Sequence, residues 1–198
     1  MSQATSGTEG RRFAHSRRDG LLASFGRMET WDAIRARRNV RTFTDRPIAE
    51  ADLHRILEAG WRSPSASNRQ KWDFVVVTDR TQLNDLSVLW AHAGHVATSA
   101  ATVVLVLPEP GNDHERSLNE YDLGQATMLM MLGAADLGIG SGHASISDKD
   151  ECRRLLGIPA GFDPAYFLAF GYPADRPLKP VEHPDRKPFD EVVHFAHW

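Results

Sequence analysis

Three arginines, Arg37, Arg38 and Arg41, fall within five residues of one another, with Asn39 between them. We call residues 37–41 the basic segment. Guanidinium groups at this spacing can converge on a phosphate, because each offers a planar pair of donors where a lysine offers only a point charge. Arginine is also favoured by the dipole at a helix C-terminus. Taken alone, the basic segment is therefore more simply interpreted as solvated surface.

A second polar stretch, residues 63–70, reverses that preference. It reads Ser-Pro-Ser-Ala-Ser-Asn-Arg-Gln, and it follows the basic segment at a distance that a single helix would span. Its Ser, Pro and Asn residues end a helix and predict a loop, which we call the serine-rich loop. The two stretches together favour an anion-binding site over a basic surface.

The composition is that of one globular domain. With 198 residues, 41% of them hydrophobic, the chain can bury a sizeable core. The net charge of -3 and the isoelectric point near 6.3 argue against a nucleic-acid or anionic-membrane surface. Cys152 is the single cysteine, which excludes an intrachain disulfide and predicts a packed or half-exposed thiol rather than a nucleophile. No apolar run is long enough for a membrane span.

Residues 1–27 differ in composition from the rest of the chain. They carry five Arg against one Glu and one Asp, with little apolar periodicity and no run typical of a secretory signal. We predict a disordered N-terminal arm over 1–27 and a folded domain over 28–198. The last part of that domain, from about 173, forms a C-terminal arm. Without a signal or a membrane span, we expect a cytoplasmic protein.

The first half of the domain is predicted to contain three helices and one strand. Thr30 can cap a helix that runs to about Arg38, with Trp31 and Ile34 on its inner face. Apolar spacing and β-branched or aromatic content predict the other elements, which are helices over 49–61 and around 83–90 and a largely buried strand over 72–78.

The second half is dominated by a helix over 118–137. Its apolar residues cover nearly the whole circumference, so it is buried centrally or against another subunit, and Gly138 provides its C-terminal stop. We interpret 138–142 as a turn that lacks the spacing of a dinucleotide fold. The tail from Pro173 has no core of its own, and a partner subunit is one candidate to support it. The remaining predicted elements are strands over 102–107 and 166–172 and a helix opened by Ser147.

Four motifs, in their order and spacing, resemble the FMN-dependent nitroreductase family from about Met28 to the C-terminus. They are Arg-Arg-Asn-Val-Arg-Thr-Phe at 37–43, Pro-Ser-Ala-Ser-Asn-Arg-Gln-Lys-Trp-Asp-Phe at 64–74, Leu-Gly-Ile-Gly at 137–140 and Arg-Lys-Pro at 186–188. The resemblance implies an α+β fold with a central, mainly antiparallel sheet flanked by helices. It also implies a domain-swapped homodimer, which would explain both the buried methionine-rich helix and the long tail.

The resemblance assigns the basic segment to the FMN phosphate and ribityl chain. Arg37, Arg38, Asn39 and Arg41 would make these contacts, and Arg186 would return to the phosphate from near the C-terminus. Asn39 stands where the family usually has a small hydroxyl residue, so this contact departs from the family pattern.

The other implied contacts are to the isoalloxazine ring. Ser145 and Ile146 would direct backbone N–H groups at the flavin N5. The serine-rich loop of the other subunit would lie against the ring, and Lys71 replaces the proline that often follows this loop in the family. The loop residues implicated are Pro64, Ser65, Ala66, Ser67, Asn68 and Gln70.

The function implied by the resemblance is an NAD(P)H-dependent flavin oxidoreductase. FMN carries its own hydride chemistry, so the protein needs only to hold the phosphate, tune the ring and leave one face open. In a ping-pong cycle NAD(P)H reduces the flavin and leaves, and a small electron-poor acceptor, a nitroaromatic or a quinone, takes its place. Positive charge near the N1/O2 edge would stabilise reduced flavin, with Arg69 and Lys71 as candidates. The sequence shows no nucleophile elbow or HExxH motif.

Two alternatives would use the same flavin cradle. One is a specialised superfamily member, such as a flavin-fragmenting benzimidazole synthase, a dehalogenase or an oxidase. The other is a non-enzymatic flavin-binding dimer whose site is closed to turnover. The histidine pairs 92/95 and 194/197 have spacings that permit metal ligation, but no acidic or cysteine partner accompanies them, so no metal is expected. Residues His92 to His95 could instead line the flavin site.

Overall fold

The computed structural model describes residues 28–198, so the prediction for 1–27 lies outside the described residues. Its centre is a four-stranded sheet with strand order β1-β2-β4-β3, in which every neighbouring pair is antiparallel. This confirms the predicted α+β class with an antiparallel sheet. The strands are β1 (Asp73–Val77), β2 (Ala101–Pro108), β3 (Gly140–Ser145) and β4 (Phe162–Gly171).

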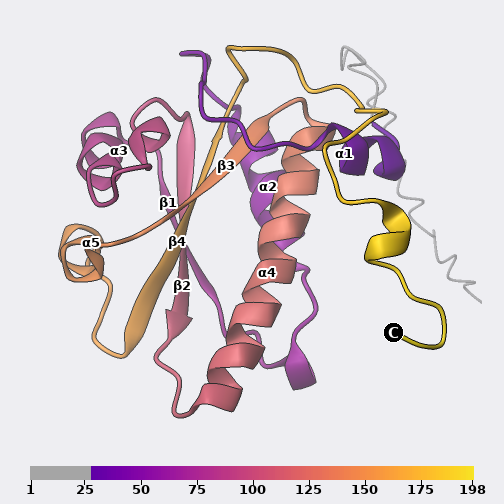
Figure 1. Ribbon diagram of the computed structural model, residues 1–198. Helices are drawn as coiled ribbons and strands as arrows, with labels where there is room; N and C mark the ends of the chain where they lie inside the picture. The colour runs from indigo at the N-terminus through magenta and orange to yellow at the C-terminus, as the bar shows by residue number, and fades with distance from the viewer. Residues whose placement is uncertain (1–27) are drawn as a thin grey trace, which may run out of the picture.

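Helices cover both faces of this sheet (Figure 1). On one face lie α2 (Glu50–Trp61) and α4 (Asp113–Asp136), which pack against each other. On the other lie α3 (Arg80–Ser87) and α5 (Lys149–Leu156). The short α1 (Thr30–Ala36) contacts α4.

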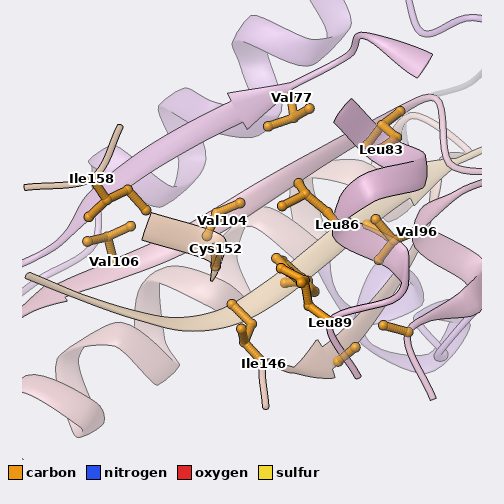
Figure 2. Packing of buried hydrophobic residues seen from close by; sticks show 14 of the residues in the cluster. Val77, Leu83, Leu86, Leu89, Val96, Val104, Val106, Ile146, Cys152 and Ile158 are labelled. Atoms are coloured by element: carbon orange, nitrogen blue, oxygen red, sulfur yellow. The ribbon is translucent and has the colours of Figure 1, made fainter. Parts of the chain in front are cut away.

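Each face of the sheet has its own hydrophobic core, because successive side chains of a strand point to opposite faces. Val104 and Val106 of β2 pack against Leu83, Leu86 and Cys152 on the α3–α5 side (Figure 2). The alternate residues of β2 belong to the α2–α4 core, together with Ile56 and Met130. Burial on both faces explains why β2 reads as an unbroken apolar run. Burial also raises the pKa of the Cys152 thiol to about 12, which agrees with a packed, non-nucleophilic cysteine.

Glycines bring α2 and α4 close together. A Cβ at Gly60 would lie 2.7 Å from Cγ of Met130, and one at Gly133 would lie 3.3 Å from Cβ of Ala59. The two helices therefore form a fixed pair, which matters because the serine-rich loop follows α2 directly.

Three predictions for the first half of the chain are wrong in detail. The inner residues of α1 are Ala33 and Ala36, whereas Trp31 and Ile34 are 67% and 44% exposed. Glu29, not Thr30, is the N-cap residue. The strand β1 is found as predicted but is not largely buried, because it forms an edge of the sheet and is only partly covered.

The second half also departs from prediction at its element boundaries. The long helix starts at Asp113, five residues early, because the Asn112 side chain caps it by accepting a hydrogen bond from Glu115 N. Residues 140–142 are not a turn but the start of β3, although Gly138 does end α4 with φ of 70°. The cap of α5 is Asp148 rather than Ser147.

The tail is tied to the domain only over its first part. Ala174 N donates to Thr42 O at 2.9 Å, and Val181 N donates to Arg35 O at 3.2 Å. Beyond these contacts lie a 3-10 turn, η3 (Phe189–Glu191), and the exposed Phe195 and Trp198. In Figure 1 this yellow segment runs outside the α4 layer. Residues 28–198 contain no helix with the length and apolarity needed to cross a membrane.

Candidate functional site

The basic segment is attached along the edge of β3. Val40 N donates to Ser141 O at 2.9 Å, and Asn39 and Ser141 form a parallel bridge. A Cβ at Gly142 would overlap the carbonyl oxygen of Val40, so glycine is required where the two backbones meet. The side chain of Val40 is fully buried. Because successive side chains of an extended segment point to opposite sides, those of Asn39 and Arg41 face outward.

Two guanidinium groups of this segment stay available for a ligand. Within residues 28–198, the ion pairs leave Arg37 and Arg41 without a carboxylate partner. Burial, followed by the charges of Arg41 and Arg37, lowers the pKa of His143 on β3. Burial also lowers the pKa of His95, and Arg41 adds to the effect. The guanidinium groups of Arg37 and Arg41 therefore create positive charge that no carboxylate of the described residues neutralises. This charge favours the binding of an anion.

Arg38, for which a phosphate contact is also predicted, makes contacts within the described chain. Its Nη2 lies 2.7 Å from Oδ1 of Asp175 and 2.8 Å from the Arg176 carbonyl oxygen. The hydrogen bond from Arg38 is the main cause of a lowered pKa at Asp175. In this chain Arg38 therefore holds the C-terminal segment against the basic segment.

The edge of β3 presents a backbone donor at Ser145. Ser141 O points away from β4, because it accepts from Val40 on the other side. In an antiparallel ladder the direction of the N–H and C=O groups alternates, so Ser145, four residues on, also directs its groups away from β4. The side chain of Ile146 is buried in the α3–α5 core, and by the same alternation its N–H points to the side opposite that of Ser145. The geometry thus singles out Ser145 N–H of the two donors that the resemblance suggested.

The serine-rich loop is strained and is held by a buried carboxylate. Ser67, Asn68 and Gln70 have φ values of 53°, 54° and 52°, a region that residues other than glycine seldom occupy. Asp122 of α4, only 5% exposed, accepts a hydrogen bond from Ala66 N at 2.9 Å. Asp122 does not stand out in the sequence as a residue of the site, because nothing local signals a contact across 56 residues.

The structure does not bring the serine-rich loop to the basic segment within one chain. The loop attaches near Asp122, whereas the basic segment attaches at Ser141, beyond the C-terminal end of α4. The part of α4 between these points spans about 20 Å at 1.5 Å per residue. Figure 1 shows the same separation, with the loop below the end of α2 and the basic segment at the opposite end of the sheet.

Three other basic candidates also lie apart from Arg37 and Arg41. Arg186, on the exposed tail, donates to the neighbouring carbonyl oxygen of Asp185 at 2.6 Å. Lys71 Nζ lies 3.7 Å from Oε1 of Glu115. A hydrogen bond from the Gly111 backbone is the main cause of a lowered pKa at Glu115, and the charges of Lys71 and Arg69 lower it further. The serine-rich loop therefore brings Arg69 and Lys71 to the N-terminal end of α4, not to Arg41.

Two hollows adjoin the basic segment and β3. The first, of about 370 Å³, is lined by Arg41, Trp90, His92, Gly94 and His95. It brings the predicted stretch from His92 to His95 next to the basic segment. The second, of about 410 Å³, lies between α4 and the sheet, where apolar groups of α4 face His143 and Tyr166. Within 28–198 no three His, Cys, Asp or Glu side chains gather at a spacing suited to a metal ion.

Comparison with known proteins decides the family. The sequence profile of the Nitroreductase family matches residues 34–94 and 88–172. The chain belongs to the nitroreductase family. This confirms the resemblance drawn from the motifs, and the matched ranges include the basic segment, the serine-rich loop and β3.

Several relatives of this nitroreductase are similar over most of their length. A protein of Archaeoglobus fulgidus with the provisional name NADH dehydrogenase/NAD(P)H nitroreductase is 30% identical over 169 residues, covering 83% of this chain and 96% of its own. The NADPH-flavin oxidoreductase of Vibrio harveyi is 28% identical, covering 83% and 72%. The 5,6-dimethylbenzimidazole synthase of Rhodospirillum rubrum is 27% identical, covering 87% and 88%.

A solved structure supports the fold. The Vibrio harveyi NADPH:FMN oxidoreductase in complex with NAD+ superimposes with a TM-score of 0.73 at 24% identity, covering 84% of this chain and 76% of that one. The residues found at the basic segment fit a flavin mononucleotide in their chemistry. Two unpaired guanidiniums suit a phosphate, the Ser145 N–H suits a ring nitrogen, and the buried His95 Nε2 has no partner within the described chain.

Proposed function

We propose that this nitroreductase passes a hydride from NAD(P)H, through FMN, to a small electron-poor acceptor such as a nitroaromatic or a quinone in a ping-pong cycle. Membership of the family makes the chain an NAD(P)H-dependent flavin oxidoreductase with FMN as its cofactor. The acceptor and the order of binding are our proposal. We also propose that residues 28–198 form the flavin-binding domain, with a C-terminal arm from about 173.

One observation carries this proposal: within residues 28–198, Arg37 and Arg41 have no carboxylate partner, and their segment is paired with Ser141 on the same edge of β3 that carries Ser145 four residues further on. When bound, FMN supplies the hydride chemistry. Arg37 and Arg41 hold its phosphate and ribityl end, with Asn39 between them. Ser145 N–H donates toward N5. The protein thus provides position and electrostatics, and no acid–base side chain is needed for hydride transfer.

The second hollow suits a planar apolar acceptor. By strand alternation, the side chains of His143 and Ser145 lie on the same face of β3 as the α2–α4 core. The hollow between α4 and the sheet is lined by apolar groups of α4 and by His143 and Tyr166. A ring bound at the Ser145 edge would therefore have an open, largely apolar space beside it, and this space is where we place the acceptor.

A second copy of the chain completes the proposed site. The serine-rich loop is held far from the basic segment of its own chain, so the loop that contacts the ring comes from a partner in our proposal. Large apolar side chains remain exposed on α1, α2, α4 and the tail. Trp31, Trp61, Tyr121 and Phe195 are 67%, 62%, 70% and 83% exposed. Exposed apolar groups of this size and number are typical of an interface. Arg186, carried on the tail, would reach the phosphate in this dimer.

The test of the proposed function is spectroscopic. The purified protein should be yellow or take up FMN, and NADH or NADPH should bleach it rapidly under anaerobic conditions. A quinone or nitroaromatic should then restore the colour. FMN at 100 times its dissociation constant should stabilise the protein by about 2.7 kcal/mol. A colourless protein whose melting temperature is indifferent to FMN would refute the proposal. FMN binding without bleaching would instead indicate the non-enzymatic flavin-binding dimer.

The benzimidazole synthase is the second candidate, because the Rhodospirillum rubrum relative covers 87% of this chain. That activity would use the same cradle but consume the flavin. Incubation of reduced FMN and the protein with oxygen, followed by product analysis, separates the two functions. Intact FMN after many turnovers supports the reductase, and a flavin fragment supports the synthase.

A further inference from the structure

His95 is a buried polar side chain with an unsatisfied nitrogen. It lies in the 3-10 turn η2 (Gly94–Val96) and is 6% exposed. Within residues 28–198, its Nε2 has no hydrogen-bond partner and is inaccessible to solvent. A buried nitrogen in this condition is unfavourable, so native proteins seldom leave one without a ligand, an ion or an ordered water.

The surroundings of His95 are suited to an anion. The turn lines the hollow of about 370 Å³ that also includes Arg41 and Trp90. The ring packs against β3, since a Cβ at Gly142 would lie 3.4 Å from His95 Cδ2. The turn is also fixed from α3, because Arg80 donates to the carbonyl oxygens of Ala97 and Ser99.

The ionisable groups around His95 are cationic or neutral. Arg41 faces it from the basic segment and His143 faces it from β3. His92 lines the same hollow, and Arg80 is the charged group that α3 directs to this turn. Burial has the largest influence on the pKa of His95 and lowers it. The charges of Arg41 and His143 lower this pKa further, whereas polar backbone groups of Gly142 and His92 raise it. Without a ligand, these surroundings therefore favour the neutral form of His95.

We propose that the His95 ring turns when the flavin nucleotide binds, so that Nε2 enters the hollow beside Arg41, binds an anionic oxygen of the nucleotide there and takes up a proton. The proton comes from solvent and turns the unsatisfied nitrogen into a charged donor. The oxygen belongs either to the phosphate or to the N1/O2 edge of the reduced ring, and both have the same chemistry. This inference rests on the proposed function. It gives this protein a histidine ligand outside the four motifs that placed it in its family.

A proton-linked ligand has a specific signature in the affinity for FMN. An anion beside His95 favours the charged imidazole, so lowering the pH through the histidine range should tighten binding. The phosphate of FMN itself gains a proton near pH 6 by analogy with other phosphate monoesters, which acts against binding by arginine. Comparison of two proteins at each pH cancels this contribution.

The experiment is a fluorescence titration of FMN between pH 6 and pH 8.5. It compares the wild-type protein, His95→Gln and the control His114→Gln, which alters an exposed histidine in the first turn of α4. We expect His95→Gln to bind FMN about tenfold more weakly than wild type at pH 6, the scale of a charged hydrogen bond, and the ratio should shrink toward pH 8.5. The control should follow wild type throughout.

Two further titrations, with riboflavin and with reduced flavin, identify which flavin oxygen His95 binds. Riboflavin lacks the phosphate, so a wild-type to variant ratio that disappears with riboflavin places His95 at the phosphate. A ratio that persists with riboflavin and grows on reduction of the ring places it at the N1/O2 edge. Equal affinities of wild type and His95→Gln for every flavin form at every pH would overturn the inference and leave an ordered water as the partner of Nε2.

A measurement on the wild type alone covers the case in which His95→Gln fails to fold. Calorimetric titration at pH 7.5 in two buffers of different ionisation enthalpy reports protons bound with FMN. Net uptake is expected, and no uptake contradicts the inference. If wild type does not bind FMN at all, the proposed function fails as well, whereas FMN binding without proton uptake removes His95 alone.

Discussion

The two halves of the candidate flavin site are built by different means. The basic segment lies along β3 through backbone pairing, with Val40 buried beneath it and glycine at the crossing. The serine-rich loop has three non-glycine residues in the left-handed region and depends on the Asp122 carboxylate. The basic segment is therefore held as firmly as the sheet on which it lies. The serine-rich loop is strained, and its hydrogen bond to α4 is the one from Ala66 N to Asp122.

This difference separates two tasks. Binding a phosphate needs donors at fixed positions. An extended segment on a sheet edge provides them with little further loss of conformational entropy on binding. In the dimer that we propose, contact with the ring held by the other subunit needs a loop that projects outward, and such a loop cannot pack on its own sheet. Strain at such a loop is expected where structure serves binding rather than stability. The predictions below test each half in turn.

The largest effect should come from separating the basic segment from β3. Gly142→Ala places a methyl group against the Val40 carbonyl, so the two backbones must move apart. We expect a loss of about 3 kcal/mol in the free energy of unfolding, the upper range for overpacking, together with loss of tight FMN binding. Chemical denaturation and FMN titration measure the two effects. Gly124→Ala, where an added Cβ meets nothing within 4 Å, is the control. Normal stability of Gly142→Ala would show that the crossing is not tight.

Removing a guanidinium tests the same half without moving its backbone. Arg41→Ala should weaken FMN binding by about 1.5–3 kcal/mol, the range for hydrogen bonds to charged groups, and leave stability unchanged because Arg41 has no carboxylate partner in the described chain. Arg154→Ala on α5, which removes an exposed pair with Glu151, is the matched control. Unchanged FMN affinity in Arg41→Ala would return the basic segment to solvated surface.

The serine-rich loop should respond to its anchor. Asp122→Ala leaves the Ala66 N–H without its acceptor and should cost about 1–2 kcal/mol of stability. It should also weaken FMN binding, since the loop would no longer be held against the ring of the partner. Asp122→Asn keeps an oxygen for Ala66 N and should restore most of the affinity. Titration of both variants with FMN checks this. Equal losses in the two variants would mean that the charge of Asp122, rather than its acceptor, matters.

The same contrast explains what could be predicted from the sequence. The long helix and β2 follow from apolar content, and the end of α4 follows from Gly138, because these signals are local. The strand β3 does not follow from the sequence, because Gly-Ser-Gly-His-Ala-Ser has little strand propensity and its first three residues predict a turn. Its glycines are explained by Val40, which is about 100 residues away.

The site could be predicted in its parts but not in its arrangement. The motifs named the basic segment and the serine-rich loop, and the structure shows that α4 keeps them apart. The motif treats Arg37 and Arg38 alike, and only the structure shows that the Arg38 guanidinium contacts Asp175 from the distant C-terminal segment. The spacing of Trp31 and Ile34 predicts that they form the inner face of α1, which is wrong because two alanines, Ala33 and Ala36, form the packed face. Each error concerns a contact between distant residues.

The smallest effect concerns the strain itself. Ser67 has φ of 53°, a conformation that is strained for a residue with a Cβ and relaxed for glycine. Ser67→Gly should therefore stabilise the folded state by about 1 kcal/mol. Part of this gain is offset, because glycine also gives the unfolded chain more conformational freedom. We therefore expect a melting temperature equal to or slightly above that of wild type. FMN affinity should fall slightly, because a glycine loop is less well fixed against the ring. Ser117→Gly, within the regular helix α4, is the opposite control and should lower stability. A clear loss of stability in Ser67→Gly would show that the serine side chain, rather than the backbone of the serine-rich loop, is what the fold requires there.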